Sequence, residues 1–232
     1  MSKAGIMRFD ATRARELLAD GMAEMTLAIN KGQMDALLEY LSLMAKWNPV
    51  YNLTAIRKTD EIVSAHLLDS LAIIGLLDAW LANKPKTKIL DVGTGGGLPG
   101  VVLAIMRPQW SLTLIDPVHK KTAFLQQVKA QLQLDNLTVI NGKVEDLPTE
   151  AQFDLITSRA FSSLINFVQL SEHVLRADGC FAAMKGVFPS EEMDALQQTF
   201  DHSWQIEPHE IHVPQLNARR HLVKISRTNP SH

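Results

Sequence analysis

The segment from Lys88 to Gly100 reads Lys-Ile-Leu-Asp-Val-Gly-Thr-Gly-Gly-Gly-Leu-Pro-Gly and decides the fold of this chain. Its first five residues have the composition of a short buried strand. The glycines at 93, 95, 96 and 97 allow a tight turn and the close approach of a ligand, because glycine has no Cβ. Leu98 and Pro99 are expected to open a helix, since proline is well tolerated at the first helical position. This order predicts a strand, a turn and a helix, with the turn at the carboxyl end of a parallel strand.

Short apolar runs and helical segments continue to alternate after this point. Further strands are expected at residues 111–115, 137–140, 153–157, 180–184, 206–213 and 221–227, and helices at 98–106, 120–132 and 164–175. Alternating strands and helices form right-handed crossovers and a parallel sheet. The last two strands lack a convincing helix between them, which favours an antiparallel pair. We therefore predict an α/β, Rossmann-like fold with a mostly parallel seven-stranded sheet and an antiparallel edge strand.

Residues 10–82 have a different pattern, in which apolar side chains recur at helical spacing. Asn30 and Gln33 resemble a capping box ahead of the first apolar face. Residues 47–56, which contain Pro49, are expected to form a loop before a second helix over residues 67–81. A boundary near residue 83 divides the chain into a helical N-terminal extension, residues 1–83, and a domain of residues 84–232 on which it packs.

Acidic residues follow the next two expected strands. Asp116 lies about twenty residues past the glycines, where a carboxylate accepts hydrogen bonds from both ribose hydroxyls of a nucleoside. After the third strand, Val144 is placed to pack on an adenine ring, and either the backbone or Glu145 to contact the exocyclic amine of that ring. Each residue alone is compatible with an ordinary turn. Their occurrence at successive strand ends indicates a nucleoside site.

The glycine spacing matches two cofactor patterns. Gly95, Gly97 and Gly100 match the dinucleotide fingerprint, which places a pyrophosphate at a helix N-terminus. Read from Asp91, the spacing Asp-x-Gly-x-Gly-x-Gly instead matches the loop that wraps the amino-acid end of S-adenosylmethionine (SAM). The antiparallel-looking strands at the end of the chain replace the second mononucleotide half of a dinucleotide fold. We therefore favour a SAM-dependent methyltransferase and keep a nicotinamide oxidoreductase as an alternative.

Composition limits the class of protein further. The 232 residues fit one domain with an extension, and the net charge of −2 argues mildly against a surface that is basic throughout. The single cysteine, Cys180, excludes an internal disulfide and indicates a reducing compartment. We expect that no apolar stretch approaches the length of roughly 20 residues that spans a bilayer. We expect a cytoplasmic protein without a membrane partner and, from the spacing of its histidines, without a metal.

Six ordered blocks match the signature of a known family. They are residues 46–54, 66–71, 91–100, 158–161, 185–186 and 220–223. On these blocks the chain resembles the bacterial small-subunit ribosomal RNA methyltransferase G family, also called the glucose-inhibited division protein B family. The resemblance implies a class I methyltransferase fold with a helical N-terminal extension. It also implies transfer of a methyl group from SAM to N7 of a guanine in the decoding-region loop of small-subunit (16S) rRNA. Gly96 and Arg219 depart from the family pattern.

The resemblance carries the family's cofactor contacts to particular positions. With the glycine loop, the predicted cofactor-binding residues are Gly93, Thr94, Gly95, Leu98, Asp116, Val144, Glu145 and Arg159. Arg159 and Lys185 are predicted to position the target, and Lys185, Arg219, Arg220 and His221 to form a basic RNA-binding cluster. A purely structural Arg159 would instead pair with Asp154 or Glu145. Because guanine N7 has a free lone pair, no general base is expected.

The expected partner is small-subunit rRNA, free or within the 30S subunit or an assembly intermediate, bound by a monomer. Trp47 and Tyr51 are interpreted as core anchors, with stacking on RNA as the alternative. His66 is interpreted as a hydrogen-bonded interior residue. Two other functions stay open, namely a SAM-dependent methyltransferase acting on another RNA or a small molecule, and a ribosome-assembly protein that has lost catalysis.

Overall fold

The computed structural model describes residues 9–228 except 83, 85, 160 and 162, and contains one seven-stranded sheet in the order β3-β2-β1-β4-β5-β7-β6. The strands are β1 (Lys88–Val92), β2 (Ser111–Asp116), β3 (Leu137–Asn141), β4 (Phe153–Ser158), β5 (Leu175–Lys185), β6 (Trp204–Ile211) and β7 (Arg220–Arg227). β1 to β5 are parallel, and β7 runs antiparallel between β5 and β6. The mostly parallel seven-stranded sheet is confirmed, with the antiparallel strand one place inside the edge strand β6.

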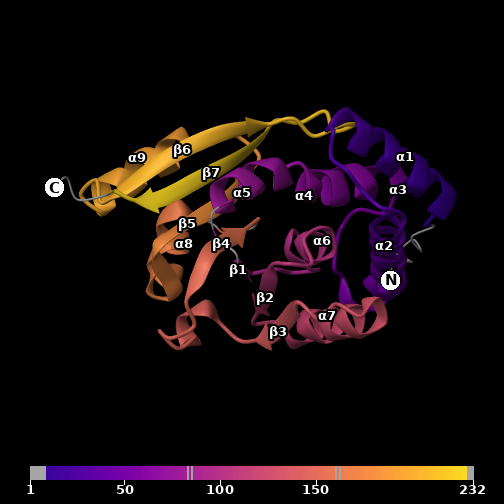
Figure 1. The fold of residues 1–232 in the computed structure, drawn as a ribbon, viewed down its shortest axis with the longest axis horizontal. Coiled ribbons are helices and arrows are strands. Elements are labelled where there is room, and N and C mark those ends of the chain that lie inside the picture. The colour runs from indigo at the N-terminus through magenta and orange to yellow at the C-terminus, as the bar shows by residue number, and fades with distance from the viewer. Residues whose placement is uncertain (1–8, 83, 85, 160, 162, 229–232) are drawn as a thin grey trace, which may run out of the picture.

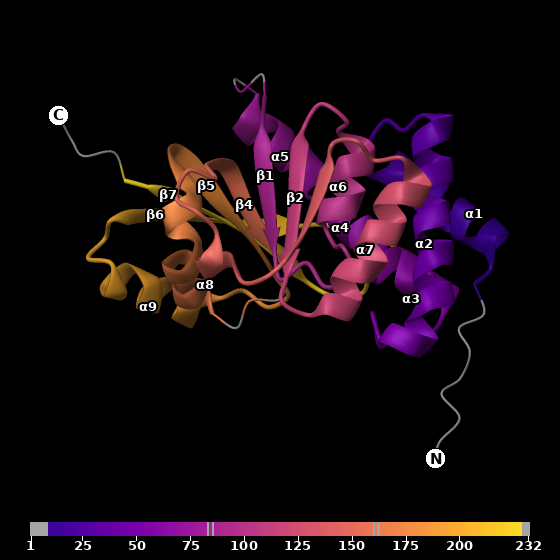
Figure 2. The ribbon, with the colours of Figure 1, turned by 90° about the horizontal axis from the view of Figure 1, so that it is seen from below.

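Different helices cover the two faces of the sheet (Figures 1 and 2). Alternate residues of each strand point to opposite faces, so Ile89 joins a core with α6 (Gly100–Met106) and α7 (His119–Leu132). Leu90 joins the opposite core with α8 (Leu164–Ser171) and α9 (Ser190–Thr199). Short 3-10 turns, η2 (Val144–Asp146) and η3 (Glu172–Val174), follow β3 and α8. The carboxyl ends of the parallel strands lie along the lower edge of the sheet in Figure 2.

The helical N-terminal region packs on the same face as α6 and α7. It contains α1 (Ala11–Glu24), α2 (Lys31–Tyr51), α3 (Thr59–Ile62), the π-helix η1 (Val63–Leu68), α4 (Asp69–Leu71) and α5 (Ile74–Leu81). Buried side chains of α1, α2, η1 and α5 belong to one hydrophobic cluster with those of α6 and α7. This shared core fixes the helical region on the sheet.

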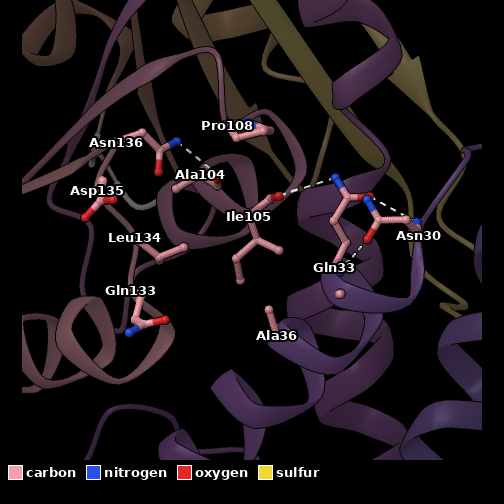
Figure 3. Close-up of a pocket in the computed structure, with 11 residues that line it drawn as sticks. Asn30, Gln33, Ala36, Ala104, Ile105, Pro108, Gln133, Leu134, Asp135 and Asn136 are labelled. Atoms are coloured by element: carbon pink, nitrogen blue, oxygen red, sulfur yellow. Dashed lines mark hydrogen bonds between the residues drawn. The ribbon is translucent and has the colours of Figure 1, made fainter.

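The capping box predicted at the start of α2 is confirmed. The Asn30 side chain accepts from the Gln33 N–H at 2.9 Å, and the Gln33 side chain accepts from the Asn30 N–H at 3.1 Å. Gln33 also donates to the carbonyl of Ile105 at 3.4 Å (Figure 3). These contacts line a cleft of about 420 Å³ at the C-terminal end of α6. Because the glycine turn precedes α6, this cleft lies at the opposite edge of the sheet.

Several of the predicted element boundaries were wrong. The helix expected at residues 164–175 ends at Ser171, and the strand expected at 180–184 begins already at Leu175. The loop expected at residues 47–56 begins only after Tyr51, because α2 continues through Pro49 in its last turn. Asn52 ends this helix with φ of 51°. The helix after the glycine turn begins at Gly100, with Pro99 as its N-cap residue. α9, between β5 and β6, was not predicted.

The expectation that no apolar stretch is long enough to cross a membrane was also wrong. The run Thr59–Leu81 has 23 residues, and the mean hydropathy of its most apolar 18-residue window is 1.7, which meets the length and composition of a span. Within its most apolar window, 67% of the residues are buried inside the protein. Contact with the core therefore accounts for the apolar character of this run.

Candidate active site

The loop between β1 and α6 crosses the carboxyl edge of the sheet at the point where the strand order reverses. β1 lies between β2 and β4, and ligands of open parallel sheets bind at such a switch point. Gly93, Gly95 and Gly97 have φ values of 65°, 60° and 99°, a region that favours glycine. A Cβ built on Gly93 would meet no atom within 4 Å. The backbone at Gly93 therefore borders open space that a ligand can occupy.

The carboxylate of Asp91 ties the two ends of this loop to β1. Its Oδ2 accepts from the Thr94 hydroxyl at 2.6 Å and from the Gly100 N–H at 2.9 Å. The residue is fully buried, and burial raises the pKa of Asp91 to about 6. Its Oδ1 is buried and has no hydrogen-bond partner among the described residues. A buried acceptor normally has a donor, so this atom fits a ligand that brings one.

Asp116, at the end of β2, lies against the glycine loop as predicted from its position. Its Oδ2 accepts from the Gly95 N–H at 3.0 Å and lies 3.4 Å from Lys121 Nζ, and its Oδ1 accepts from the Val118 N–H at 2.9 Å. An ionised carboxylate offers about four lone-pair sites. Asp116 can therefore accept further hydrogen bonds beside those that hold the loop.

The other predicted cofactor residues differ in how far they are accessible. Thr94, Leu98 and Val144 are buried, and Val144 belongs to the core under α8. Gly93 and Glu145 are exposed, and Gly95 is half-buried. The structure gathers these residues at the ends of β1, β2 and β3, which are neighbours in the sheet. Val144 offers a ligand only a narrow surface.

Tyr40 of α2 supports the glycine loop and was not predicted. Its side chain is fully buried, and its hydroxyl donates to the carbonyl of Gly96 at 2.6 Å. Burial raises the pKa of Tyr40, so the hydroxyl keeps its proton at neutral pH. A Cβ on Gly97 would lie 3.2 Å from this hydroxyl. The sequence signal was a polar group on the apolar face of α2, beside Leu37 and Leu41.

A second cleft, of about 370 Å³, opens at the ends of β4, β5 and β7. Arg159 donates to the carbonyl of Ala65 at 3.1 Å and lies 3.7 Å from Asp69 Oδ2. Arg220 Nε donates to the other oxygen, Asp69 Oδ1, at 2.8 Å. The ion-pair partner of Arg159 is therefore Asp69, and the alternatives Asp154 and Glu145 were wrong. Two guanidinium groups around one carboxylate leave the cleft with a net positive charge.

The predicted basic cluster is divided by the structure. Lys185 lies in this cleft but forms an ion pair with Glu192 at 2.7 Å. His221 is buried, and its Nδ1 lies 3.2 Å from the Gly186 carbonyl. Arg219 is exposed and lines a separate hollow with residues 210–213 and 216–218. Arg159, Lys185 and Arg220 share one cleft, whereas Arg219 stands outside it.

The aromatic residues Trp47 and Tyr51 and the imidazole of His66 make contacts within the protein. Trp47 and Tyr51 stack on each other at a centroid distance of 5.1 Å and pack against the core, as interpreted from the sequence. His66 is buried, with Nε2 at 2.8 Å from the Thr54 hydroxyl. Burial lowers the pKa of His66 to about 4, so its ring is neutral at pH 7. In the described part of the chain, no three His, Cys, Asp or Glu side chains are grouped to hold a metal ion.

This sheet order, the glycine loop and the acidic residue at the end of β2 define the class I SAM-dependent methyltransferases. Solved structures support the fold. A human methyltransferase 10 domain containing protein matches with a TM-score of 0.54 and 15% identity, covering 68% of this chain and 80% of that one. A SAM-dependent methyltransferase from Aquifex aeolicus matches with a TM-score of 0.52 and 15% identity, covering 68% and 90%.

Sequence comparison identifies the family within this class. The family model described as rRNA small subunit methyltransferase G matches residues 33–223. The chain is 46% identical to the ribosomal RNA small subunit methyltransferase G of Janthinobacterium sp. (strain Marseille), covering 95% of this chain and 98% of the relative. It is 47% identical to the protein of the same name from Laribacter hongkongensis (strain HLHK9), covering 91% and 97%. The chain belongs to the rRNA small subunit methyltransferase G family, and SAM is its methyl donor.

Replacing Gly93 by leucine is expected to abolish SAM binding while the fold survives. The new side chain enters the open space beside the loop, and its positive φ costs about 1–2 kcal/mol. Titration calorimetry should show SAM affinity reduced more than a hundredfold, with circular dichroism unchanged. Gly75→Leu is the matched control, because a Cβ at Gly75 also meets no atom within 4 Å but lies on α5. Undiminished affinity in Gly93→Leu would refute the loop assignment.

The affinity for SAM is expected to rise with pH through about 6, the value to which burial raises the pKa of Asp91. A ligand that donates to Asp91 Oδ1 favours the ionised carboxylate, and at pH 5 only roughly a tenth of this group is ionised. Affinity should therefore be about tenfold weaker at pH 5 than at pH 7.5. The folding stability of the ligand-free protein should instead fall with rising pH. Protonated Asp91 contributes stability that is lost as pH rises through about 6.

Calorimetric titrations at both pH values, with Asp91→Asn as the control, check this dependence. The variant cannot ionise at this position, so its affinity should be low and flat over the same range. A wild-type affinity that is equal at pH 5 and pH 7.5 would exclude Asp91 as the titrating ligand.

Proposed function

We propose that this protein transfers the methyl group of SAM to N7 of a guanine in the decoding-region loop of small-subunit (16S) rRNA. The observation that carries the proposal is the open, net positive cleft of Arg159, Asp69 and Arg220, which lies at the end of β4, the strand next to β1 and its cofactor loop. A positive cleft suits a phosphate-bearing substrate better than a neutral small molecule. The names of the relatives, which act on small-subunit ribosomal RNA, support the same substrate.

In this proposal the cofactor lies along the ends of β1, β2 and β3. Gly93, Thr94, Gly95 and Leu98 surround its amino-acid end, Asp116 binds its ribose, and Val144 and Glu145 contact its adenine. Arg159 directly follows β4, the strand that pairs with β1 on its other side, and lines the substrate cleft. SAM supplies a methyl group on a positively charged sulfur, which is already a good leaving group.

The residues of the cleft act by position and not by removing a proton. Guanine N7 carries a free lone pair, so attack requires alignment and the exclusion of water. The titratable groups of the cleft are already paired, since Asp69 lies between two arginines and neutral His66 contacts Thr54. Arg159 and Lys185 orient the target, and Arg220 binds an RNA phosphate.

We propose the same chain organisation as the sequence indicates, with residues 1–83 as a helical extension and 84–232 as the methyltransferase domain. The contact of Tyr40 with the Gly96 carbonyl supports an extension that takes part in shaping the cofactor site. We further propose that a monomer acts in the cytoplasm on rRNA, either free or within the 30S subunit or an assembly intermediate.

Incubation with SAM labelled on its methyl group tests the function directly. Small-subunit RNA from cells lacking the enzyme, offered free and as assembled subunits, should take up label at one guanine. Borohydride reduction and aniline cleavage should then break the RNA at an N7-methylguanine in the decoding-region loop. Label that resists this cleavage, or that appears only in a small molecule or in another RNA, would overturn the proposal.

Replacing Arg220 by glutamine is expected to weaken RNA binding and to make it less dependent on salt. Loss of one phosphate contact reduces the slope of log affinity against log salt by roughly 0.7 for single-stranded RNA. Lys88→Gln is the control, because Lys88 is exposed at the start of β1, on the opposite edge of the sheet. Filter binding from 50 to 300 mM salt gives both slopes. An unchanged slope in Arg220→Gln would remove this residue from the interface.

A further inference from the structure

The turn between β5 and α9, residues 186–189, leads away from the substrate cleft at Gly186 and exposes two adjacent apolar side chains. Val187 is 84% exposed and Phe188 46% exposed. Among the described residues, the other exposed large hydrophobic side chains are the single residues Val50 and Val118. The turn begins at Gly186, which lines the cleft together with Lys185 and Arg220. Adjacent exposed apolar side chains often mark a binding surface, so we ask which ligand would cover this pair.

Phe188 is held in a defined orientation. Its ring packs edge-on against the buried ring of His221, with centroids 5.4 Å apart and planes 76° apart. His221 in turn contacts the carbonyl of Gly186 through Nδ1 at 3.2 Å. On the other side of the turn, Lys185 is paired with Glu192 of α9 at 2.7 Å. Both ends of the turn are therefore fixed, and the exposed part of the Phe188 ring faces solvent two residues after Gly186, which lines the cleft.

We propose that Phe188 is a stacking platform for an unpaired RNA base next to the target guanine. The inference rests on the proposed function and adds a substrate contact to it. A phenyl ring matches the width of a nucleobase, and aromatic stacking tolerates any base because every base has a π-face. The neighbouring cleft provides the positive charge for the phosphate of the same strand. Stacking and a phosphate contact side by side are the usual combination for single-stranded RNA.

The size of the patch argues for a base and against a second protein molecule. A stable protein interface covers about 800 Å² on each partner, far more than two side chains supply. The aromatic residues considered from the sequence do not compete for the role, since Trp47 and Tyr51 stack on each other and are only partly exposed. Of the aromatic residues that the structure describes, Phe188 alone is exposed.

The test uses the full chain and a single-stranded RNA oligonucleotide that spans the decoding-region loop, with 2-aminopurine beside the target guanine. Phe188→Ala should weaken binding by about 5- to 150-fold and remove the fluorescence quenching that stacking produces. Phe188→Leu, which keeps an apolar side chain without a π-face, should lose affinity and quenching as Phe188→Ala does. Phe188→Trp should restore both affinity and quenching. The salt slope should stay at the wild-type value in all three, because no phosphate contact is lost.

Val50→Ala is the matched control, since it removes another exposed apolar side chain at the end of α2. It should bind the oligonucleotide as the wild type does. Wild-type affinity and quenching in Phe188→Ala, or a leucine variant as good as the wild type, would overturn the platform. So would a concentration-dependent dimer that dissociates in Phe188→Ala, which would assign the patch to a second copy of the chain.

The same variants separate this inference from the proposed function. If the wild type places no label on small-subunit RNA, the function fails. If the wild type labels the guanine and Phe188→Ala does so with the same kcat/KM, only the platform fails. SAM affinity, measured in parallel, should be equal in all variants, because Phe188 belongs to none of the elements that border the glycine loop.

Discussion

The carboxylate of Asp91, buried beneath the glycine loop, is the constraint on which the active site depends. Removing a charge from water is costly unless hydrogen bonds replace the lost hydration. Two donors to its Oδ2, the Thr94 hydroxyl and the Gly100 N–H, come from the two ends of the loop, so pairing this oxygen also closes the loop. Gly100 must be a glycine, because a Cβ there would lie 2.0 Å from Leu114 and 2.8 Å from Asp91 Oδ2. The position of α6 and the shape of the loop thus follow from one buried group.

The substrate cleft is built by a chain of contacts that begins in the helical region. The Asn48 side chain accepts from the N–H of Thr54 and donates to its carbonyl, which fixes the segment after α2. The Thr54 hydroxyl contacts His66, and the π-helix that carries His66 directs the Ala65 carbonyl towards Arg159. π-helical turns often occur at functional sites. The charged side chains of the cleft are consequently oriented by residues of both regions of the chain.

Local patterns in the sequence predicted the elements that depend on local information. The strand β1 was predicted with its observed bounds, and the capping box of α2 was predicted because its two partners are three residues apart. The pairing of Arg220 with Asp69 joins residues 151 positions apart and has no local signal. The clustering of Arg219, Arg220 and His221 in sequence suggested one basic patch. Alternation along β7 instead turns the buried His221 to the face opposite Arg220, and Arg219 lies in the loop before the strand, outside the cleft.

The net charge of −2 is a poor guide to what this protein binds, and the structure shows why. Charges on the surface are screened beyond about 8 Å at physiological ionic strength, so a substrate responds to the groups near it and not to the total. Near the cleft, Glu192 forms an ion pair with Lys185, and Asp69 lies between two arginines, which leaves an excess of positive charge. Elsewhere, exposed pairs such as Arg13 with Asp60 and Arg15 with Asp35 cancel locally. An acidic chain can therefore present a positive cleft beside its cofactor loop, and the arrangement of the ion pairs decides which surface an RNA meets.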